Sequence, residues 1–310
     1  MPVAREAISP SFAGHETFTL RYSWLKKAVN AIVADGELFG RPDAMVSLGV
    51  GKNMVRSIRH WALAVGVLEE DPGFPNNRGR SLRVSELGEL IFGEDGIDPY
   101  LENVGTVWLI HYLLASRPDG PTTWYWAFNH LSDLEFPVGR LVADLAQRAE
   151  ANDWNRVAKT TLERDVNCFI RTYIPVKRSR TVAVEDTLDC PLTELGLIDS
   201  IDSDGTYAFV RGHHPSLPTN VFAFALLQFW KRIAPRSQSL GFYDIAYEVG
   251  SPGKVFKLSE SAVVDHMREI AKVTRRRVRF SSTAGLVQVY REKEICPFDV
   301  LRSLQGGRRR

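Results

Sequence analysis

The chain has 310 residues, which is long enough for two or three domains and a substantial core. Its composition, 44% hydrophobic and 25% charged, is that of an ordinary soluble protein. No apolar run approaches the ~18–20 residues of a membrane span, and the first residues lack the charged-then-apolar pattern of a signal peptide. The three cysteines are too few and too scattered for a disulfide framework or a zinc knuckle. We therefore expect a cytoplasmic protein without a membrane partner.

The net charge of +2 is unevenly distributed. From Lys254 to Arg310 the chain carries fourteen Lys or Arg residues against six Asp or Glu residues. Much of this excess lies in the tract "TRRRVR", residues 274–279, and in the final "GGRRR". Such clusters favour polyanionic partners, and contacts of this kind weaken as salt rises.

In chain order, residues 1–40 open with an extended segment, "FAGHETFTL", that leads into a helix. His15, Glu16 and Arg21 lie close together here. A histidine can act as a base or metal ligand near neutral pH, and an arginine can bind phosphate with two parallel hydrogen bonds. These three residues are the candidate catalytic set, with Glu16 as a metal ligand.

A structural role is the competing interpretation of the same residues. In an extended segment His15 and Glu16 point to opposite sides, so adjacency does not make them a catalytic pair. Phe12 and Phe18 would then anchor the segment, while His15 and Glu16 cap nearby backbone groups.

The stretch "SLGVGKNMVRSIRHWALAVGVLEE", residues 47–70, raises the question of a nucleotide site. A P-loop needs G-x-x-x-x-G-K-[ST], because backbone N–H groups cradle the phosphates and the final hydroxyl holds magnesium. With Gly51 and Lys52 as the GK pair, Val46 replaces the first glycine and Asn53 replaces the hydroxyl residue. Both requirements fail, so no nucleotide cofactor is expected.

A basic helix fits this stretch better. Its apolar residues recur at helical spacing and form a narrow stripe: Met54, Ile58, Trp61 and Val65. Lys52, Arg56 and Arg59 share another face, roughly 160° away at about 100° per residue. A short helix before it and a two-stranded hairpin after it complete the order of a winged helix-turn-helix. The alternatives are a solvated charged face and a surface that docks an acidic protein.

The middle of the chain, residues 94–175, predicts a helical region. A strongly apolar helix over residues 98–117 should lie in the core, and two more helices should follow it before Pro175. Within the last of these, Asp165 is expected to pair with Arg171. The aromatic stretch "TTWYWAFNH", residues 122–130, could stack exposed bases, although dense aromatics more often belong to a core.

Residues 176–220 are rich in Asp, Ser, Thr, Gly and Pro and predict a linker between the halves, with a short hairpin signal. Residues 221–310 then repeat the helix-then-hairpin layout, with a helix capped near Ser259 and two alternating strands joined across residues 283–285. The predicted fold class is mostly α with small β-hairpins. In it, residues 1–93 and 221–310 form two winged-helix-like modules around the helical middle.

Several motifs resemble those of a bacterial family long classified as a domain of unknown function. They are "FAGHETFTLRYSWLKK" (12–27), "LGVGKNMVRSIRHWALAVGVLE" (48–69), "WYWAFNH" (124–130), "ERDVNCFIRTY" (163–173) and "GSPGKVFKLSE" (250–260). The resemblance spans nearly the whole chain. The best-described members are SspB-like proteins of single-strand DNA phosphorothioation systems, which are viewed as DNA nickases and encoded beside DNA sulfur-modification genes.

The resemblance implies that the chain cuts the backbone of one DNA strand in support of DNA phosphorothioation and phage defence. It also implies a cysteine desulfurase, an ATP pyrophosphatase and an ATPase as partners. Phosphodiester cleavage often uses a divalent metal, which makes Mg²⁺ and Mn²⁺ the candidate cofactors. The alternative is a non-catalytic DNA-binding adaptor or regulator that recruits the modification enzymes, because no nuclease motif stands out.

The residues expected to contact DNA lie on or beside the two basic helices and in the first hairpin. They are Lys52, Asn53, Arg56, Arg59, Arg78, Arg80, Lys254, Arg268, Lys272, Arg275, Arg276 and Arg277. Because helical DNA-binding modules often work in pairs, a homodimer is a candidate assembly.

Overall fold

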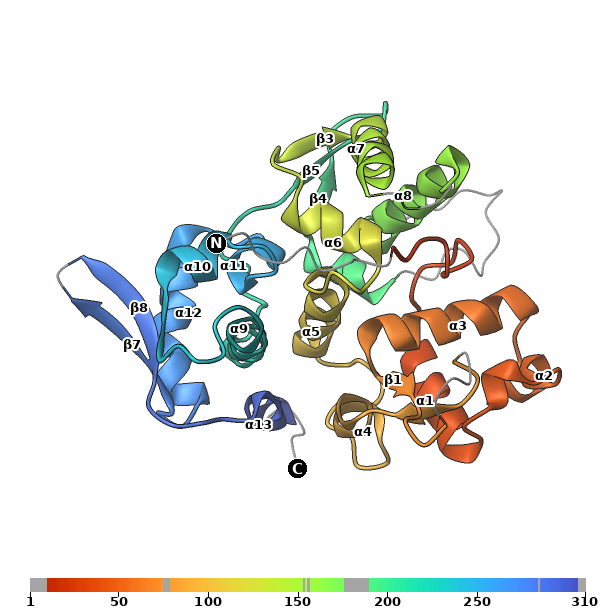
Figure 1. The fold of residues 1–310 in the computed structure, drawn as a ribbon, viewed down its shortest axis with the longest axis horizontal. Coiled ribbons are helices and arrows are strands. Elements are labelled where there is room, and N and C mark those ends of the chain that lie inside the picture. The colour runs from red at the N-terminus through yellow and green to blue at the C-terminus, as the bar shows by residue number, and fades with distance from the viewer. Residues whose placement is uncertain are drawn as a thin grey trace.

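The computed structural model describes residues 10–74, 79–152, 154, 157–175, 190–283 and 285–305. The described chain is largely helical, with small antiparallel sheets (Figure 1). None of the helices in these ranges has the length and apolar character that a membrane span requires. The α-helices are α1 (Trp24–Ala34), α2 (Ala44–Leu48), α3 (Lys52–Val65), α4 (Glu86–Phe92), α5 (Val104–Ala115), α6 (Thr122–Asn129), α7 (Val138–Ala151), α8 (Lys159–Tyr173), α9 (Thr219–Ile233), α10 (Phe242–Tyr247), α11 (Pro252–Val255), α12 (Glu260–Val273) and α13 (Pro297–Leu301).

The strands pair in three small sheets, in each of which the neighbours are antiparallel. Their order is β1 (Leu68–Glu70) with β2 (Leu82–Val84), then β3 (Glu135–Pro137), β5 (Thr206–Phe209) and β4 (Ile198–Ser200), and finally β6 (Ser239–Gly241), β8 (Leu286–Arg291) and β7 (Val278–Thr283). Each predicted hairpin is therefore present. The short strands β3 and β6, which the sequence patterns do not predict, each add an edge strand to one of these hairpins.

The N-terminal unit consists of α1, α2, α3 and the β1–β2 hairpin. α3 buries Val55, Ile58 and Trp61 and packs against α1 and α5. Gly66 ends α3 with a φ of 80°, the left-handed conformation that favours glycine at a helix C-terminus. The chain after α1 also joins the hairpin, because the Leu82 N–H of β2 donates to the Gly36 carbonyl at 2.9 Å.

Residues 13–17 form turns, so the expectation of an extended segment here is wrong. Ala13, Glu16 and Thr17 have φ values of 58°, 47° and 68°. The Glu16 N–H donates to the Ala13 carbonyl at 3.0 Å, and the Phe18 N–H donates to the His15 carbonyl at 2.8 Å. Contacts from distant elements fix these turns, as the candidate site shows below.

The middle of the chain places α5 at the centre of the molecule (Figure 1). This helix is buried along nearly its whole length, as its apolar sequence predicts. α6 contacts α5, α7 and α8, and the sheet formed by β3, β5 and β4 joins residues 135–137 to residues 198–209. In the described part of the predicted linker, the 3₁₀ turn η3 (Pro191–Leu195) packs against α5 and α8.

The C-terminal unit follows the order α9, β6, α10, α11, α12, β7 and β8. α9 packs against α12 and α13, and α12 packs against β7. The predicted N-cap of α12 is confirmed, because the Ser259 hydroxyl accepts the Ala262 N–H at 3.3 Å. β6 pairs with β8 much as the chain near Gly36 pairs with β2 in the first unit.

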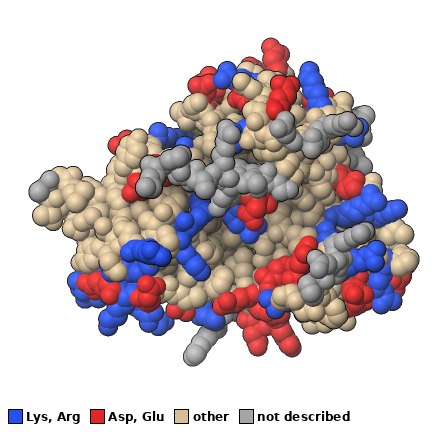
Figure 2. Space-filling view, viewed as in Figure 1, with Lys and Arg blue, Asp and Glu red and all other residues tan. Residues whose placement is uncertain are grey.

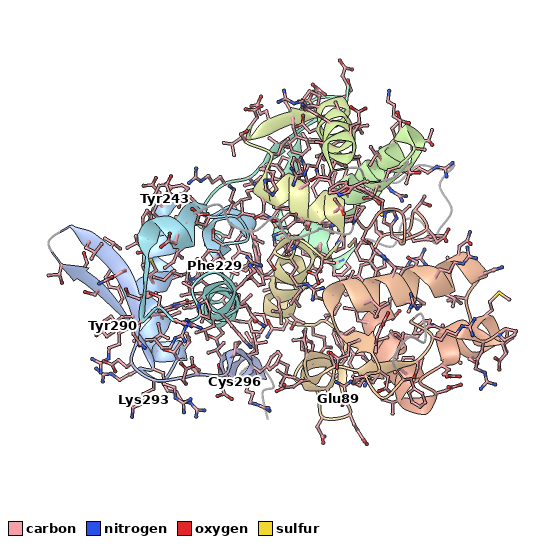
Figure 3. The ribbon with its side chains drawn as sticks, viewed as in Figure 1. Glu89, Phe229, Tyr243, Tyr290, Lys293 and Cys296 are labelled. Atoms are coloured by element: carbon pink, nitrogen blue, oxygen red, sulfur yellow. The ribbon has the colours of Figure 1, made fainter. Side chains whose placement is uncertain are left out.

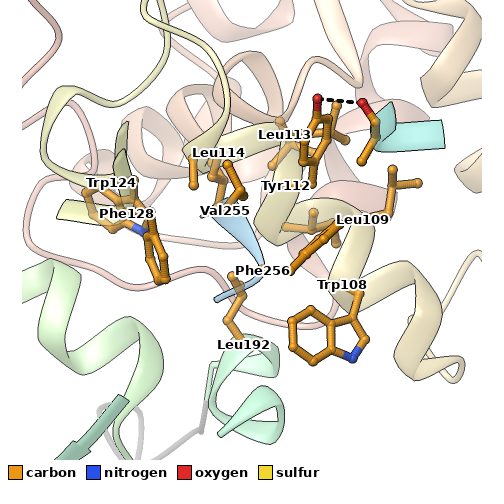
Figure 4. Packing of buried hydrophobic residues seen from close by; sticks show 14 of the residues in the cluster. Trp108, Leu109, Tyr112, Leu113, Leu114, Trp124, Phe128, Leu192, Val255 and Phe256 are labelled. Atoms are coloured by element: carbon orange, nitrogen blue, oxygen red, sulfur yellow. Dashed lines mark hydrogen bonds between the residues drawn. The ribbon is translucent and has the colours of Figure 1, made fainter. Parts of the chain in front are cut away.

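One continuous hydrophobic cluster extends from Leu20 to Leu301 and includes residues of all parts of the chain. Figure 4 shows its centre, where Trp108 and Tyr112 of α5 lie against Phe256, at ring-centroid distances of 5.7 and 5.6 Å. The two flanking units are therefore built onto a shared core, which fixes their positions relative to α5.

Candidate functional site

His15 lies in the turn before α1 and is only 1% exposed. Its Nε2 lies 2.8 Å from Oδ1 of Asp165 on α8, and its Nδ1 accepts the Thr17 N–H at 3.0 Å. Because Nδ1 accepts a hydrogen bond, the ring proton lies on Nε2, which donates to the carboxylate. Both ring nitrogens are therefore engaged.

Asp165 is equally buried and holds this region together. Besides His15 it accepts the Ala13 N–H at 2.6 Å and the Thr123 hydroxyl at 2.5 Å. These donors offset the penalty of burying a carboxylate and tie the N-terminal turn to α6 and α8. The expected partner of Asp165 was Arg171, and this expectation is wrong: Arg171 donates to the Thr17 carbonyl instead.

Aromatic rings surround His15. The ring centroids of His60, Trp61 and Trp124 lie 5.9, 6.2 and 5.9 Å from its own. A Cβ on Gly14 would lie 2.4 Å from Nδ1 of His60, so this close approach requires glycine in the "FAGHE" motif. Burial, together with the neighbouring His15, lowers the pKa of His60 to about 4.

The three predicted catalytic residues have different partners. His15 faces Asp165, whereas Glu16 forms an ion pair with Arg56 of α3 at 3.1 Å. The Arg21 guanidinium lies 5.2 Å from the ring centroid of Trp24 and 5.9 Å from that of Phe18. A catalytic role for the three residues stays a prediction. Their described contacts tie the N-terminal turn to the core and to α3.

The described residues contain no group of three or more His, Cys, Asp or Glu side chains that could hold a metal ion. Two of the three cysteines, Cys168 and Cys190, are buried, and all three are free.

The start of α3 forms the first basic surface. Lys52, Asn53 and Arg56 are exposed. Arg59 of the same face is half-buried and donates to the Gly79 carbonyl at 2.8 Å, so it joins α3 to the hairpin loop. Arg80 is exposed in that loop, and Arg78 lies outside the described residues.

The end of α12 and the residues after it form the second basic surface. Arg268 and Lys272 are exposed and pair with Asp265 and Glu269 on the same helix. Arg275 and Arg276 are exposed in left-handed conformations, with φ values of 50° and 61°.

Farther along this surface, Arg277 is half-buried, lies 4.0 Å from Asp299 and donates to the Glu294 carbonyl at 3.2 Å. Figure 2 shows basic side chains near α3 on the right and near the base of β7–β8 on the lower left, with acidic ones around α4 between them. Basic side chains therefore gather at both sides of the visible face, with acidic ones interspersed among them.

The structure places Lys254 in a different setting from the α12 residues. It lines a cavity of about 540 Å³, together with Lys257 and Arg211. Lys257 and Arg211 do not stand out in the sequence. They lie in the loops around β5 and α11, without the helical periodicity that marks α3 and α12.

The fold and these surfaces define a class: a protein about half helical, with small antiparallel sheets, a shared core and two flanking helix-plus-hairpin units that carry basic residues. The chain belongs to the family described as "Protein of unknown function (DUF4007)", whose model matches residues 12–303. No curated protein matches it.

Two solved structures are similar over almost the whole chain. The SspB crystal structure shares 30% sequence identity at a TM-score of 0.85 and covers 96% of this chain and 88% of that one. The magnesium ion-bound SspB crystal structure has the same identity and TM-score and covers 97% and 89%. The chain is thus SspB-like in fold along nearly its full length.

Proposed function

We propose that the chain is an SspB-like DNA-binding protein that nicks one DNA strand in support of DNA phosphorothioation and phage defence. The observation that carries the DNA-binding part is the exposed start of α3. Lys52, Asn53 and Arg56 extend into solvent there, beside a hairpin loop that also carries Arg80. Basic side chains at one end of a helix can pair with the phosphates of a DNA backbone, and the asparagine can hydrogen-bond to a base edge or a phosphate.

The arrangement of each flank supports a winged-helix interpretation. α1, α2, α3 and the β1–β2 hairpin follow the order of such a module, and so do α9, α10, α12 and the β7–β8 hairpin. In helix-turn-helix proteins the recognition helix lies in the major groove with its N-terminal residues toward the bases. On this interpretation α3 and α12 are the DNA-facing helices.

The nicking part of the proposal rests on the similarity to SspB. The relative with bound magnesium supports Mg²⁺ as the cofactor. The described residues hold no group of three or more possible ligands, so Glu16 alone is kept as a candidate metal ligand and no complete ligand set is assigned. Mg²⁺ usually keeps several waters and binds through one or two carboxylates plus substrate phosphates.

A non-catalytic adaptor is the second candidate function, and the setting of His15 favours it. This residue is buried with both ring nitrogens hydrogen-bonded, while Glu16 and Arg21 have other partners. On this alternative the turn before α1 is structural, and the chain recruits the modification enzymes to DNA.

Incubation of supercoiled plasmid with the full chain and Mg²⁺ or Mn²⁺ separates the two candidates. We expect open circles with wild type, and loss of open circles with Glu16→Gln while plasmid binding persists. Glu150→Gln, an exposed change on α7, should nick like wild type. Plasmid binding without open circles in either metal would replace the nickase with the adaptor.

The proposal extends to location and partners. A cytoplasmic chain that serves phosphorothioation would work with a cysteine desulfurase, an ATP pyrophosphatase and an ATPase. A homodimer would double the basic flanks along one DNA duplex. Sedimentation of the purified chain, alone and with DNA, measures directly whether it forms a homodimer.

A further inference from the structure

A cavity of about 540 Å³ opens between the loop after α6 and the α10–α11 region. This volume lies in the range of small-molecule and nucleotide sites. The described residues that line it include three cations, Arg211, Lys254 and Lys257, and no aspartate or glutamate. The cavity is therefore electrostatically suited to an anion.

Lys257 is the most deeply placed of the three cations. It is 9% exposed, its Nζ donates to the Phe128 carbonyl at 2.9 Å, and its ammonium lies 4.1 Å from the ring centroid of Phe209. Among the described residues no second hydrogen-bond acceptor serves this group, which has three N–H donors. Its backbone is left-handed, with a φ of 51°, a strained conformation that clusters at ligand sites.

Lys254 and Arg211 complete the positive wall. Lys254 is half-buried; burial lowers its pKa, while the charge of nearby Glu248 raises it. Arg211 is exposed; its Nε donates to the Leu258 carbonyl at 3.1 Å, and its guanidinium lies 6.0 Å from the Tyr247 ring. Of the acids nearby, Glu260 already accepts the Tyr247 hydroxyl.

Burial also lowers the pKa of Lys257 to about 7, and the charges of Lys254 and Arg211 act in the same direction. An anion among the three cations would relieve this repulsion. The geometry of the cavity and the electrostatics of its wall thus indicate the same kind of ligand.

An exposed aromatic ring lies beside the cations. Tyr243 lines the cavity, is 68% exposed, and has its ring centroid 5.1 Å from that of Tyr247. Figure 3 shows it at the upper edge of the C-terminal unit, at the opposite end from Lys293. Proteins bind unpaired nucleotides by stacking the base on an exposed aromatic ring and by holding the phosphate with nearby cations.

We propose that this cavity binds one unpaired nucleotide, with its phosphate at Lys254, Lys257 and Arg211 and its base on Tyr243. The nucleotide can belong to a single DNA strand or be a free mononucleotide, because both present the same groups. The site differs from the duplex-binding surfaces proposed for α3 and α12, and it does not depend on them.

Fluorescence and calorimetric titration of the full chain with a single-stranded tetranucleotide, and separately with deoxynucleoside monophosphates, tests the site. Lys254→Gln should weaken binding about tenfold, the effect of one charge-assisted hydrogen bond. Tyr243→Ala should weaken it by a similar factor through lost stacking. Both positions are partly or fully exposed, so these variants should fold, which circular dichroism checks. The control Lys293→Gln removes an exposed lysine at the far end of the unit and should bind like wild type.

The outcomes are distinct. Tighter binding of the tetranucleotide than of the monophosphates assigns the site to a DNA strand, and equal or tighter binding of the monophosphates assigns it to free nucleotide. Unchanged binding by Lys254→Gln and Tyr243→Ala would overturn the proposal, and so would no binding of either ligand by wild type. Duplex affinity measured on Tyr243→Ala, which lies outside the residues expected to contact duplex DNA, should not change, so failure here is separable from failure of the α3 surface.

Discussion

At the scale of single residues, the most constrained part of the molecule is the buried trio of His15, Asp165 and Thr123. Asp165 accepts hydrogen bonds from the side chains of His15 and Thr123 and from the Ala13 N–H, which belong to two segments distant from it in the chain. A carboxylate that is 1% exposed is tolerated because each oxygen meets a donor. These hydrogen bonds also orient the turn that brings Glu16 to Arg56.

Asp165→Ala should lower the free energy of unfolding by about 3 kcal/mol, because it leaves buried donors on His15, Thr123 and Ala13 without an acceptor. Urea unfolding measures this change. Asp144→Ala, which removes an i,i+4 ion pair with Arg140 on α7, should change the value by less than about 0.5 kcal/mol. Similar losses of unfolding free energy in the two variants would show that the buried network stabilises the fold no more than an exposed ion pair does.

At the scale of elements, the placement of α3 depends on the turn that ends the helix as much as on its apolar face. Gly66 adopts a φ of 80°, and its N–H donates to the Leu63 carbonyl at 3.0 Å while the Val67 N–H donates to the Ala62 carbonyl at the same distance. This left-handed turn directs the chain from α3 into β1 and so sets the hairpin beside the basic helix.

Gly66→Ala should therefore destabilise the fold by about 1 kcal/mol, because an L-residue is strained at this φ. Thermal unfolding would report a lower Tm. The matched change is Gly139→Ala in the first turn of α7, where a Cβ meets nothing within 4 Å. That variant should be neutral or slightly stabilising, since alanine favours the helix. A lower Tm for Gly139→Ala alone would contradict this account.

Elements with strong periodicity could be predicted from the sequence, and short or nonlocal features could not. The apolar stripe and terminal glycine of α3 and the N-cap of α12 define those helices locally. β3 and β6 have three residues each, too few for an alternating pattern, and they exist because β5 and β8 offer partners. Contacts between distant residues decide such strands.

The candidate site shows the same division. Exposure of Lys52 and Arg56 follows from the helical spacing, whereas the pairing of His15 with Asp165 joins residues 150 positions apart. No local pattern contains that contact. The cations of the cavity are likewise gathered from separate loops, so only the three-dimensional arrangement brings Arg211 to Lys254 and Lys257.

At the scale of the whole molecule, one core supports two charged flanks, and several histidines lie in that core or against it. Burial lowers the pKa of His111 to about 3 and that of His60 and His266 to about 4 each. These side chains are neutral in the folded protein near pH 6, whereas in the unfolded chain they bind protons below about pH 6.5. The unfolded state is therefore favoured as the pH falls.

We expect the contribution of these neutral histidines to the free energy of unfolding to be complete above about pH 6.5 and to be lost progressively between pH 6.5 and 4. The loss should be up to about 1.4 kcal/mol per pH unit for each of these histidines. Urea unfolding at pH 7.5, 6 and 5 measures it. His60→Phe keeps an aromatic ring and removes one proton site, so its stability should depend less steeply on pH. An identical slope in the variant and wild type would contradict the assignment.

The most direct test of DNA binding through α3 is the salt dependence of duplex affinity for wild type, Arg56→Ala and Arg140→Ala. Arg56 and Arg140 are both exposed and both paired with an acid, but Arg140 lies on α7, away from the proposed surface. Fluorescence anisotropy at a series of salt concentrations gives the slope of log affinity against log salt. We expect weaker binding and a slope smaller by about 1 for Arg56→Ala, with Arg140→Ala equal to wild type. Equal slopes and affinities for all three proteins would contradict it.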